Sequence, residues 1–219
     1  MRLDQQLLEA LGQESQAVLH LYEWQQDSAT YGYFLKPSDF LNMEGVNRRK
    51  LDLARRPTGG GIIFHVWDMA FSVLVPAQHP AFSLNTLDNY AFVNKAVLRA
   101  VQEFLKVDKP LSITPTDLEA LDCSSQRFCM AQPTKYDVIL EGRKIAGAAQ
   151  RKTKQGFLHQ GTIALIAPPQ DYLEDVLLPG TRVAEAMKRY TQPLVVDSDP
   201  REVKHILGSL IYKYLKEVV

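Results

Sequence analysis

Two segments far apart in the chain combine cations, glycines and short apolar runs in a way that suits a binding site. The first runs from Arg55 to His65 and reads Arg-Arg-Pro-Thr-Gly-Gly-Gly-Ile-Ile-Phe-His. Three successive glycines allow backbone angles that other residues avoid, and they leave their N–H groups open to a ligand. The arginines add fixed positive charge. This segment therefore predicts a pocket where backbone and cation meet a carbonyl or a phosphate.

The second segment, residues 141–150 followed by 158–162, has one lysine, Lys144, at the head of a strand of small residues. Residues 145–150 read Ile-Ala-Gly-Ala-Ala-Gln, and such small side chains let a neighbouring group pack close to the strand. Lysine is ordinarily a solvated surface residue, and His159 in the next strand, taken without its context, is more typical of a core histidine. The glycine segment by itself also fits a hairpin with two surface arginines. Only the two segments together favour a site.

The elements expected to hold these segments alternate between helices and strands. Apolar spacing predicts helices over 3–11, 86–105, 182–190 and 200–218, a partly helical stretch over 38–50, and strands over 18–24, 31–34, 62–64, 71–75, 136–140, 145–150 and 157–167. Residues 111–127 are rich in Ser, Thr, Pro and Asp, which predicts a mobile loop with a short helix after Thr116. We expect an α+β fold in a single domain over 1–219, with a mixed β-sheet flanked by helices.

Composition excludes several classes of function. Lys plus Arg and Asp plus Glu number 25 each among 219 residues, so we expect neither nucleic acid nor a membrane surface as a partner. No apolar run approaches the roughly 20 residues of a membrane span. The first residues do not form a signal peptide, which predicts a cytoplasmic protein. Cys123 and Cys129 lack the partners of a zinc site.

Both segments, in this order, resemble the catalytic domain of the biotin/lipoate A/B protein ligase family. The resemblance rests on Arg-Arg-Pro-Thr-Gly-Gly-Gly followed by a histidine, on Gly-Arg-Lys-Ile-Ala-Gly-Ala-Ala-Gln-Arg and on Leu-His-Gln-Gly-Thr. It extends over most of the chain and is strongest to the lipoate–protein ligase A and octanoyltransferase branch. It implies protein lipoylation, the transfer of an octanoyl or lipoyl group to the ε-amine of a specific lysine.

The resemblance also implies roles for individual residues. Cys129 opens Cys-Met-Ala-Gln-Pro-Thr-Lys-Tyr-Asp-Val, which is similar to the segment of the cysteine transferases that holds the nucleophile. A cysteine thiolate suits attack on a thioester, and Lys144 would favour the thiolate and stabilise the oxyanion. Cys129 could instead be a small buried apolar residue. The substrate-binding residues implied are Arg56, Thr58, Gly59, Gly60, Gly61, His65, Gly147, Gln150, His159 and Gly161.

Several positions depart from one branch or the other. Gly61 is more typical of the ligases, whereas the cysteine transferases often carry a larger residue there. The family's His-Asp pair is His65-Val66 here, and Asp68 fits an acidic position of the transferases. These departures weaken the case for ATP and metal binding more than for acyl binding, and no metal ligand is assigned. The chain ends before a full C-terminal accessory domain, which favours a transferase, a ligase whose accessory part is a separate chain, or an enzyme that has lost full activity.

The favoured reading is transfer of octanoate from acyl carrier protein through a Cys129 thioester, with no cofactor. The acceptors would be lipoyl domains of 2-oxoacid dehydrogenases or the glycine-cleavage H protein. A first alternative is an ATP- and Mg-dependent lipoate–protein ligase, which would form lipoyl-AMP and leave Cys129 incidental. A second alternative, from another class, is a non-catalytic module that binds acyl groups or carrier proteins.

Overall fold

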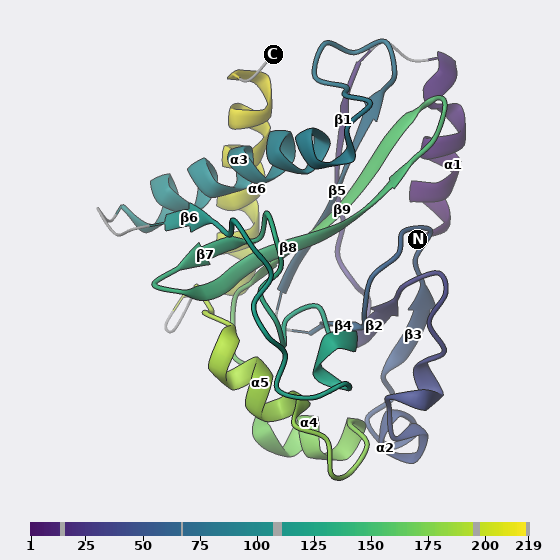
Figure 1. The fold of residues 1–219 in the computed structure, drawn as a ribbon, viewed down its shortest axis with the longest axis vertical. Helices are drawn as coiled ribbons and strands as arrows, with labels where there is room; N and C mark the ends of the chain where they lie inside the picture. The colour runs from purple at the N-terminus through teal and green to yellow at the C-terminus, as the bar shows by residue number, and fades with distance from the viewer. Residues whose placement is uncertain (14–15, 67, 107–110, 195–197, 218–219) are drawn as a thin grey trace.

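The fold is built on two β-sheets, one of six strands and one of three (Figure 1). The computed structural model describes residues 1–13, 16–66, 68–106, 111–194 and 198–217. The main sheet has the strand order β1-β5-β9-β8-β7-β6, and all its neighbouring strands are antiparallel. Its strands are β1 Val18–Leu21, β5 Asp68–Pro76, β6 Leu111–Ile113, β7 Val138–Leu140, β8 Arg143–Lys152 and β9 Gly156–Ala164.

The second sheet has three strands in the order β3-β2-β4. They are β2 Ser28–Tyr31, β3 Asp52–Arg55 and β4 Ile63–His65. Strand β2 pairs in parallel with β3 and antiparallel with β4. The expected α+β domain is thus confirmed. Among the described strands, parallel strand pairing is confined to this small sheet, and isolated parallel bridges join Ile62 to Phe128 and Lys144 to Thr191.

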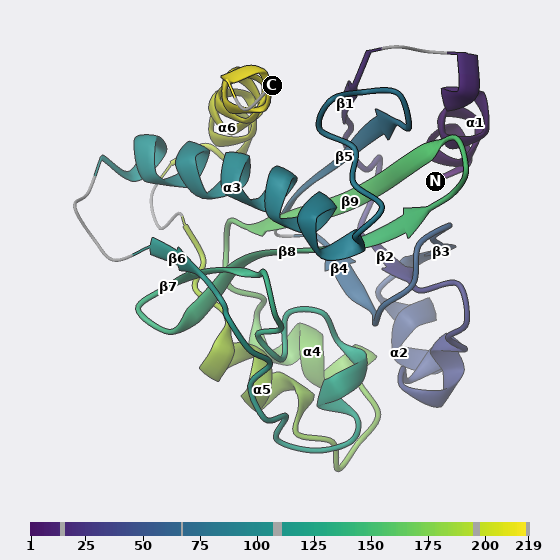
Figure 2. The ribbon, with the colours of Figure 1, turned by 45° about the horizontal axis from the view of Figure 1, so that its top comes forward.

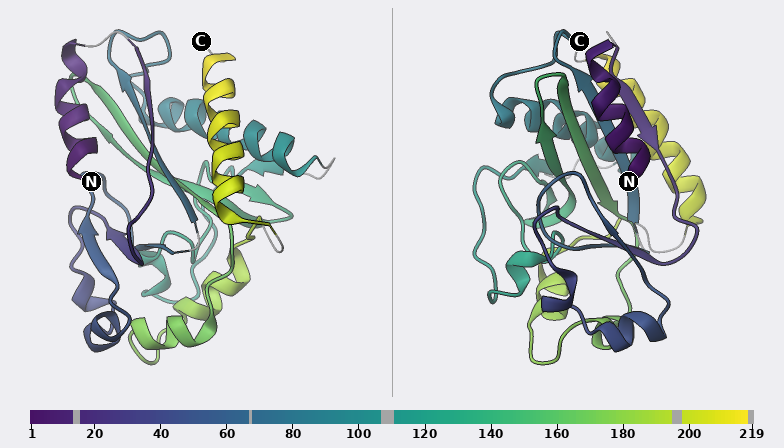
Figure 3. Two further views of the ribbon diagram at one scale, coloured as in Figure 1. Left: turned by 180° about the vertical axis from the view of Figure 1, so that it is seen from behind. Right: turned by 90° about the vertical axis from the view of Figure 1, so that its right-hand side faces the viewer.

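Helices cover both faces of the main sheet. Helices α3 Thr86–Leu105 and α6 Pro200–Glu217 cover one face and α1 Arg2–Ala10 the other. The remaining described helices are α2 Met43–Arg48, α4 Gln170–Val176 and α5 Val183–Tyr190, with short 3-10 turns η1 Leu11–Gln13, η2 Pro37–Asp39 and η3 Ser125–Arg127. Figure 2 shows α3 lying across the main sheet with α6 beside it. Figure 3 shows α1 from behind and from the side, near β5 and β9.

The alternation of side chains along β5 divides the core into two layers. Phe71 and Val73 point to the α3 and α6 face, where they pack with residues such as Val97 and Ile211. Leu74 points to the opposite face and packs with Leu8 of α1. Because every residue of β5 and of β9 is buried, both faces of the sheet centre are covered. A third cluster joins the small sheet to α2, α4 and α5.

The glycine-rich segment differs from the hairpin that the sequence suggested. Strands β3 and β4 flank it, yet they do not pair with each other, because β2 lies between them. Arg56 is buried rather than on the surface. The hairpin interpretation with two surface arginines is therefore wrong.

Other elements differ from expectation at their ends. The strand predicted over 31–34 is β2, which ends at Tyr31. No helix follows Thr116, and the nearest helical turn is η3. Helix α4 was not predicted. Asp199 accepts the Arg201 backbone N–H at the start of α6, as a helix cap does. No described helix is both long and apolar enough to span a bilayer.

Candidate active site

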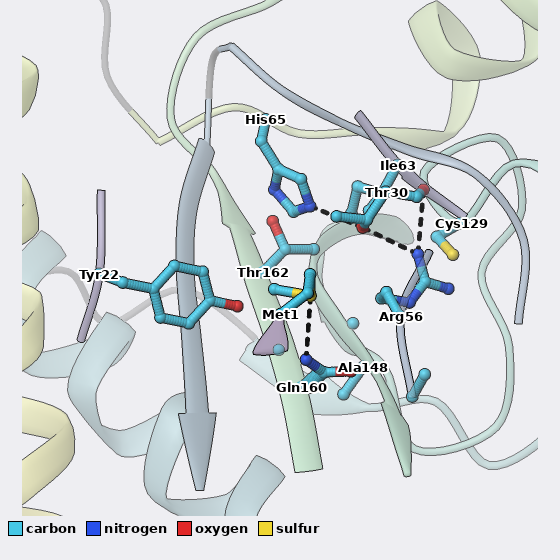
Figure 4. A pocket seen from close by; sticks show the side chains of 13 residues that line it. Met1, Tyr22, Thr30, Arg56, Ile63, His65, Cys129, Ala148, Gln160 and Thr162 are labelled. Carbon is cyan, nitrogen blue, oxygen red and sulfur yellow. Dashed lines mark hydrogen bonds between the residues drawn. The ribbon is translucent and has the colours of Figure 1, made fainter. Parts of the chain in front are cut away.

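A cavity lies between the two sheets, on the face of the main sheet that is opposite to α3 and α6 (Figure 4). The space inside it is narrow, about 30 Å³. Its lining residues come from both sheets, from the ends of β1 and β3, from Met1 before α1 and from the segment before β7: Met1, Tyr22, Thr30, Arg56, Ile63, His65, Cys129, Gly147, Ala148, Ala149, Gln160, Gly161 and Thr162. The surface of the cavity is mainly apolar, so it suits an apolar chain.

Cys129 reaches this cavity because its segment is bonded to the start of β4. The Cys129 N–H donates to the Ile62 carbonyl at 2.9 Å, and the Ile62 N–H donates to the Arg127 carbonyl at 2.6 Å. Gly61 permits this approach, since a Cβ there would lie 2.3 Å from the Arg127 carbonyl oxygen. The Cys129 thiol is partly exposed and lies next to Gly60. The glycine-rich segment thus holds the cysteine by backbone contact.

Lys144 is a buried cation directly behind Cys129. Its Nζ donates to the Cys129 carbonyl oxygen at 2.6 Å and pairs with the Asp137 carboxylate at 2.6 Å. The side chains of Lys144 and Asp137 are only 3% and 4% exposed. An ammonium group has three N–H donors, so one remains for a ligand after these two contacts.

Asp137 is held in turn by Thr134, whose N–H and hydroxyl both donate to the same carboxylate oxygen at 2.6 and 2.9 Å. Burial raises the pKa of the Asp137 carboxyl, and the Lys144 ammonium and the Thr134 hydrogen bonds oppose that rise. Gly147 provides the space for this arrangement, since a Cβ there would lie 2.3 Å from Lys144 Cε and 2.6 Å from Nζ. Because Gly147 lines the cavity, the ammonium lies just beneath the cavity wall.

Arg56 fixes the glycine-rich segment from inside. Its Nη2 donates to the Gly59 and Gly61 carbonyls at 2.8 Å each, and its Nη1 donates to Thr30 Oγ1 at 3.0 Å. It is 4% exposed. An arginine is charged at any relevant pH, so this guanidinium adds a permanent positive charge to the cavity wall near Cys129.

His65 is positioned by three groups. Asp68 Oδ2 lies 2.7 Å from its Nδ1, Thr30 Oγ1 lies 2.8 Å from its Nε2, and Trp24 stacks on its ring at 4.6 Å between centroids. The Thr30 hydroxyl accepts from Arg56 and can therefore donate to His65. The Asp68 carboxylate can only accept, so His65 Nδ1 donates to it. Asp68 is thus the acidic partner of His65, a position that the family's His-Asp pair would give to residue 66.

A polar chain ties α1 to the glycine-rich segment across the cavity. Asp4 is fully buried and accepts from Ser72 at 2.7 Å and from Gln160 Nε2 at 2.6 Å, while His20 Nδ1 lies 2.7 Å from its other oxygen. Gln160 Oε1 accepts from the Thr58 hydroxyl at 2.8 Å. The chain from Asp4 through Gln160 to Thr58 therefore joins α1, β9 and the glycine-rich segment.

A family model for the lipoyl protein ligase A/B catalytic domain matches residues 1–207. This chain belongs to that family. The membership expected from the glycine-rich and lysine segments is confirmed.

Among curated relatives, the octanoyltransferase LipM of Geobacillus kaustophilus is 31% identical over 192 residues, which cover 86% of this chain and 69% of that protein. The octanoyltransferase LipM of Bacillus subtilis is 30% identical over 174 residues, which cover 78% of this chain and 62% of that protein.

Solved structures of the family share the fold. A lipoate-protein ligase A bound with ATP superimposes with a TM-score of 0.71 at 21% identity, covering 97% of this chain and 78% of that chain. A bi-partite lipoate protein ligase from Thermoplasma acidophilum gives 0.70 at 20% identity, covering 97% and 76%. At this level of identity the likeness shows the fold alone.

Most of the site residues expected from the sequence lie together. Arg56, His65, Cys129, Gly147 and Gly161 line the cavity. Lys144 lies just beneath Gly147, and Thr58 to Gly61 form the wall around Arg56. The sequence placed these residues in one pocket, and the two sheets bring them there.

Gln150 and His159 lie elsewhere, on the α3 face of the main sheet. The His159 ring packs against Phe71 and Tyr90, and its Nδ1 lies 2.8 Å from Gln150 Nε2. Neither lines the cavity, because residues 159 and 160 point to opposite faces of β9. Burial lowers the pKa of His159 to about 3, so it is a neutral core histidine.

Sequence reasoning missed the polar residues that hold the site from a distance. Asp137 and Gln160 stand within the quoted motifs, yet no role was expected of them or of Asp4, since each forms a contact with a residue far away in the chain. The helical spacing of Leu8 and Leu11 did indicate which side of α1 is buried, and Asp4 lies on that side as a polar exception. Among the described residues, no three His, Cys, Asp or Glu side chains lie close enough to hold a metal ion.

Proposed function

We propose that this chain is an octanoyltransferase that moves an octanoyl group from acyl carrier protein, through Cys129, to a lysine of a lipoyl domain or of the glycine-cleavage H protein. The observation that carries the proposal is the thiol at the wall of an apolar cavity, with the Lys144 ammonium bonded to the same residue's carbonyl. The relatives at 30–31% identity are named octanoyltransferases, which supports the same activity.

In the first step the Cys129 sulfur attacks the thioester carbonyl. A new C–S bond forms to Cys129, the C–S bond to the carrier's thiol breaks, and that thiol leaves with the proton that Cys129 gave up. The third N–H of Lys144 and the Arg56 guanidinium stabilise the negative charge that develops in this step. The octanoyl chain lies in the apolar cavity, past Ile63 and Ala149.

In the second step the neutral ε-amine of the acceptor lysine attacks the Cys129 thioester. A C–N bond forms, the C–S bond to Cys129 breaks, and the amine's surplus proton returns to the cysteine sulfur. The products are an amide and a free thiol. An amide is more stable than a thioester, so transfer proceeds without ATP. The cysteine divides one acyl transfer into two easier steps.

The decisive experiment follows the acceptor. Purified protein is incubated with a lipoyl domain and octanoyl–acyl carrier protein without ATP, and in parallel with lipoate and Mg-ATP. Intact-mass spectrometry of the lipoyl domain should show an octanoyl adduct in the first reaction. Lipoylation only in the second reaction would make the protein an ATP-dependent ligase and contradict the proposal. A lipoyl domain whose target lysine is replaced by arginine is the control for the acceptor.

A further inference from the structure

Thr191, which follows helix α5, links the backbone around Cys129 to the backbone of Lys144. It is buried, and its hydroxyl donates to the carbonyl of Met130, the neighbour of Cys129, at 2.6 Å. Thr191 also forms an isolated parallel bridge to Lys144, in which the Gln192 N–H donates to the Lys144 carbonyl at 2.8 Å. Thr191 does not line the cavity that holds the thiol, yet it joins the nucleophile's segment to the lysine strand.

The backbone of Thr191 is fixed independently of its hydroxyl. Its N–H donates to the Met187 carbonyl at 3.0 Å at the end of α5, and its carbonyl accepts from Arg143. The Arg143 guanidinium also donates to the Lys188 carbonyl at 3.0 Å. Because Arg143 directly precedes Lys144, the end of α5 and the start of β8 form one unit. Threonine is β-branched and stiff at χ1, so its hydroxyl is a rigid donor on that unit.

Two successive carbonyls of the nucleophile's segment are therefore held from the side of the lysine strand. The Cys129 carbonyl accepts from Lys144 Nζ at 2.6 Å, and the Met130 carbonyl accepts from Thr191 Oγ1, also at 2.6 Å. The first donor lies at the end of a flexible four-carbon stem. The second donor is short and stiff, so it restricts the segment more strongly. The place of the Cys129 backbone relative to β8 thus depends on Thr191 as well as on the ammonium.

The relative position of the thiol and the ammonium matters because both act on one carbonyl group of the substrate. When the Cys129 sulfur attacks a thioester, negative charge develops on the carbonyl oxygen, and a donor stabilises it only at hydrogen-bond distance. A shift of the Cys129 segment by about 1 Å would keep the thiol in the cavity but move that oxygen away from Lys144 Nζ, and misplacement on this scale can cost about 10²-fold in rate. Thr191 is placed to prevent such a shift.

We propose that Thr191 is a positioning residue for acyl transfer, and that its hydroxyl keeps Cys129 in register with Lys144 through the Met130 carbonyl. The assignment rests on the octanoyltransferase function proposed above. It extends the functional site beyond the cavity to the end of α5, a helix that contributes no residue to the cavity lining. Thr191 itself touches no substrate in this assignment, because it acts through the backbone of the nucleophile's segment.

The test compares two reactions of the same sulfur. Octanoyl–acyl carrier protein, without ATP or acceptor, acylates Cys129 through an oxyanion. Iodoacetamide alkylates Cys129 by displacement of iodide, which forms no oxyanion. Both single-turnover rates are measured by mass, and the modified residue is located by peptide mapping because Cys123 is exposed as well. The readout is the ratio of acylation to alkylation at Cys129. Reduced access to the thiol lowers both rates, whereas a misplaced ammonium lowers the ratio.

Thr191→Val removes the hydroxyl at nearly constant size. It should lower the ratio about tenfold or more, through the acylation rate at saturating carrier protein, while the carrier concentration that gives half of this rate stays the same. Thr181→Val is the matched control, because the Thr181 hydroxyl also donates to a backbone carbonyl, that of Leu178 at 3.0 Å. Thr191→Ser keeps the hydroxyl and should keep the ratio. If Thr191→Val does not fold, Thr191→Ser and Thr191→Ala, which differ by the hydroxyl alone, give the same comparison.

Equal ratios in Thr191→Val and Thr181→Val would overturn the assignment, and so would an equal loss in Thr191→Ser and Thr191→Ala. In both cases an octanoyl adduct on Cys129 of the unsubstituted protein leaves the octanoyltransferase proposal standing. If the unsubstituted protein reacts with iodoacetamide at Cys129 but gives no octanoyl adduct, the transferase proposal is contradicted and the positioning role of Thr191 is overturned with it.

Discussion

The Lys144 ammonium is positioned by the absence of a side chain at Gly147. A Cβ at that position would overlap Lys144 Cε at 2.3 Å and Asp137 Oδ1 at 2.7 Å. The lysine would have to move away from the Cys129 carbonyl and from the cavity wall. Since stabilisation of a developing charge depends on donor geometry within fractions of an ångström, the small-residue run after Lys144 has a direct chemical purpose in the proposed reaction.

Gly147→Ala should therefore slow single-turnover acylation of the protein by octanoyl–acyl carrier protein by about 10²-fold or more. Gly12→Ala is the matched control, because a Cβ there meets only the flexible Gln155 side chain, at 3.2 Å. The measurement is the rate at which the octanoyl adduct appears by mass. An unchanged rate in Gly147→Ala would show that the position of Lys144 is not important for acylation.

His159 gives a second prediction at this scale, about stability. Its pKa is lowered from 6.5 to about 3 by burial, so the unfolded chain takes up a proton below pH 6.5 while the folded chain does not. The free energy of unfolding should fall, from this group, by up to about 1.4 kcal/mol per pH unit between about pH 6 and pH 3. Above pH 6.5 the group is neutral in both states and contributes no pH dependence.

Urea unfolding of the protein at pH 7, 6, 5 and 4 measures this slope. His159→Gln should flatten it, whereas substitution of the exposed His205 by Gln should leave it unchanged. The same slope in the His159→Gln variant as in the unsubstituted protein would mean that His159 is protonated in the fold.

The amino-acid sequence predicts the residues that carry chemistry better than the residues that position them. Cys129, Lys144 and Arg56 belong to dense local motifs, so their grouping was foreseeable. Asp137 and Gln160 gain their meaning only from partners that the fold brings close. His159 was expected at the site because it belongs to a motif. Strand alternation instead directs its side chain into the core.

Among the elements, α1 contributes to the site through a single buried carboxylate. Asp4 accepts hydrogen bonds from Ser72 of β5 and Gln160 of β9, and it pairs with His20 of β1. Helix α1 is therefore fixed to three strands through one residue. Its apolar contacts are few, with Leu8 as its one buried apolar residue.

Asp4→Ala should leave Ser72 and Gln160 without their acceptor and cost about 1–3 kcal/mol for each buried donor that stays unpaired. Hydrogen exchange of the amides in α1 should become faster, while exchange in α3 stays the same. Gln5→Ala, which removes only an exposed contact with Glu9, is the control. Equal protection of α1 in the Asp4→Ala and Gln5→Ala variants would contradict this role of Asp4.

Local patterns predicted the long elements well and the short ones poorly. Helices α3 and α6 were evident from apolar spacing, and β8 and β9 from small and β-branched residues. Strand β2 pairs in parallel with β3 across more than twenty residues of chain, and no local pattern encodes such a pairing. The glycine-rich segment looked like a hairpin for the same reason, because the strand that separates β3 from β4 comes earlier in the sequence.

At the scale of the whole molecule, the proposed site exists only where the two sheets meet. The main sheet supplies Gly147 and Gln160, the small sheet supplies Thr30 and His65, and the segment before β7 supplies Cys129. The fold class was predictable from the alternation of elements. The contact between the sheets was not, since it depends on packing among residues far apart in the sequence.

The central claim is that Cys129 carries the octanoyl group, and intact-mass spectrometry of the protein tests it most directly. The protein is mixed with octanoyl–acyl carrier protein in the absence of ATP and acceptor, and the adduct is located by peptide mapping. The account predicts one octanoyl group on Cys129, released by hydroxylamine and absent from Cys129→Ala, while Cys123→Ala retains it. An adduct that persists in Cys129→Ala, or full octanoyl transfer to a lipoyl domain by that variant, would contradict the account.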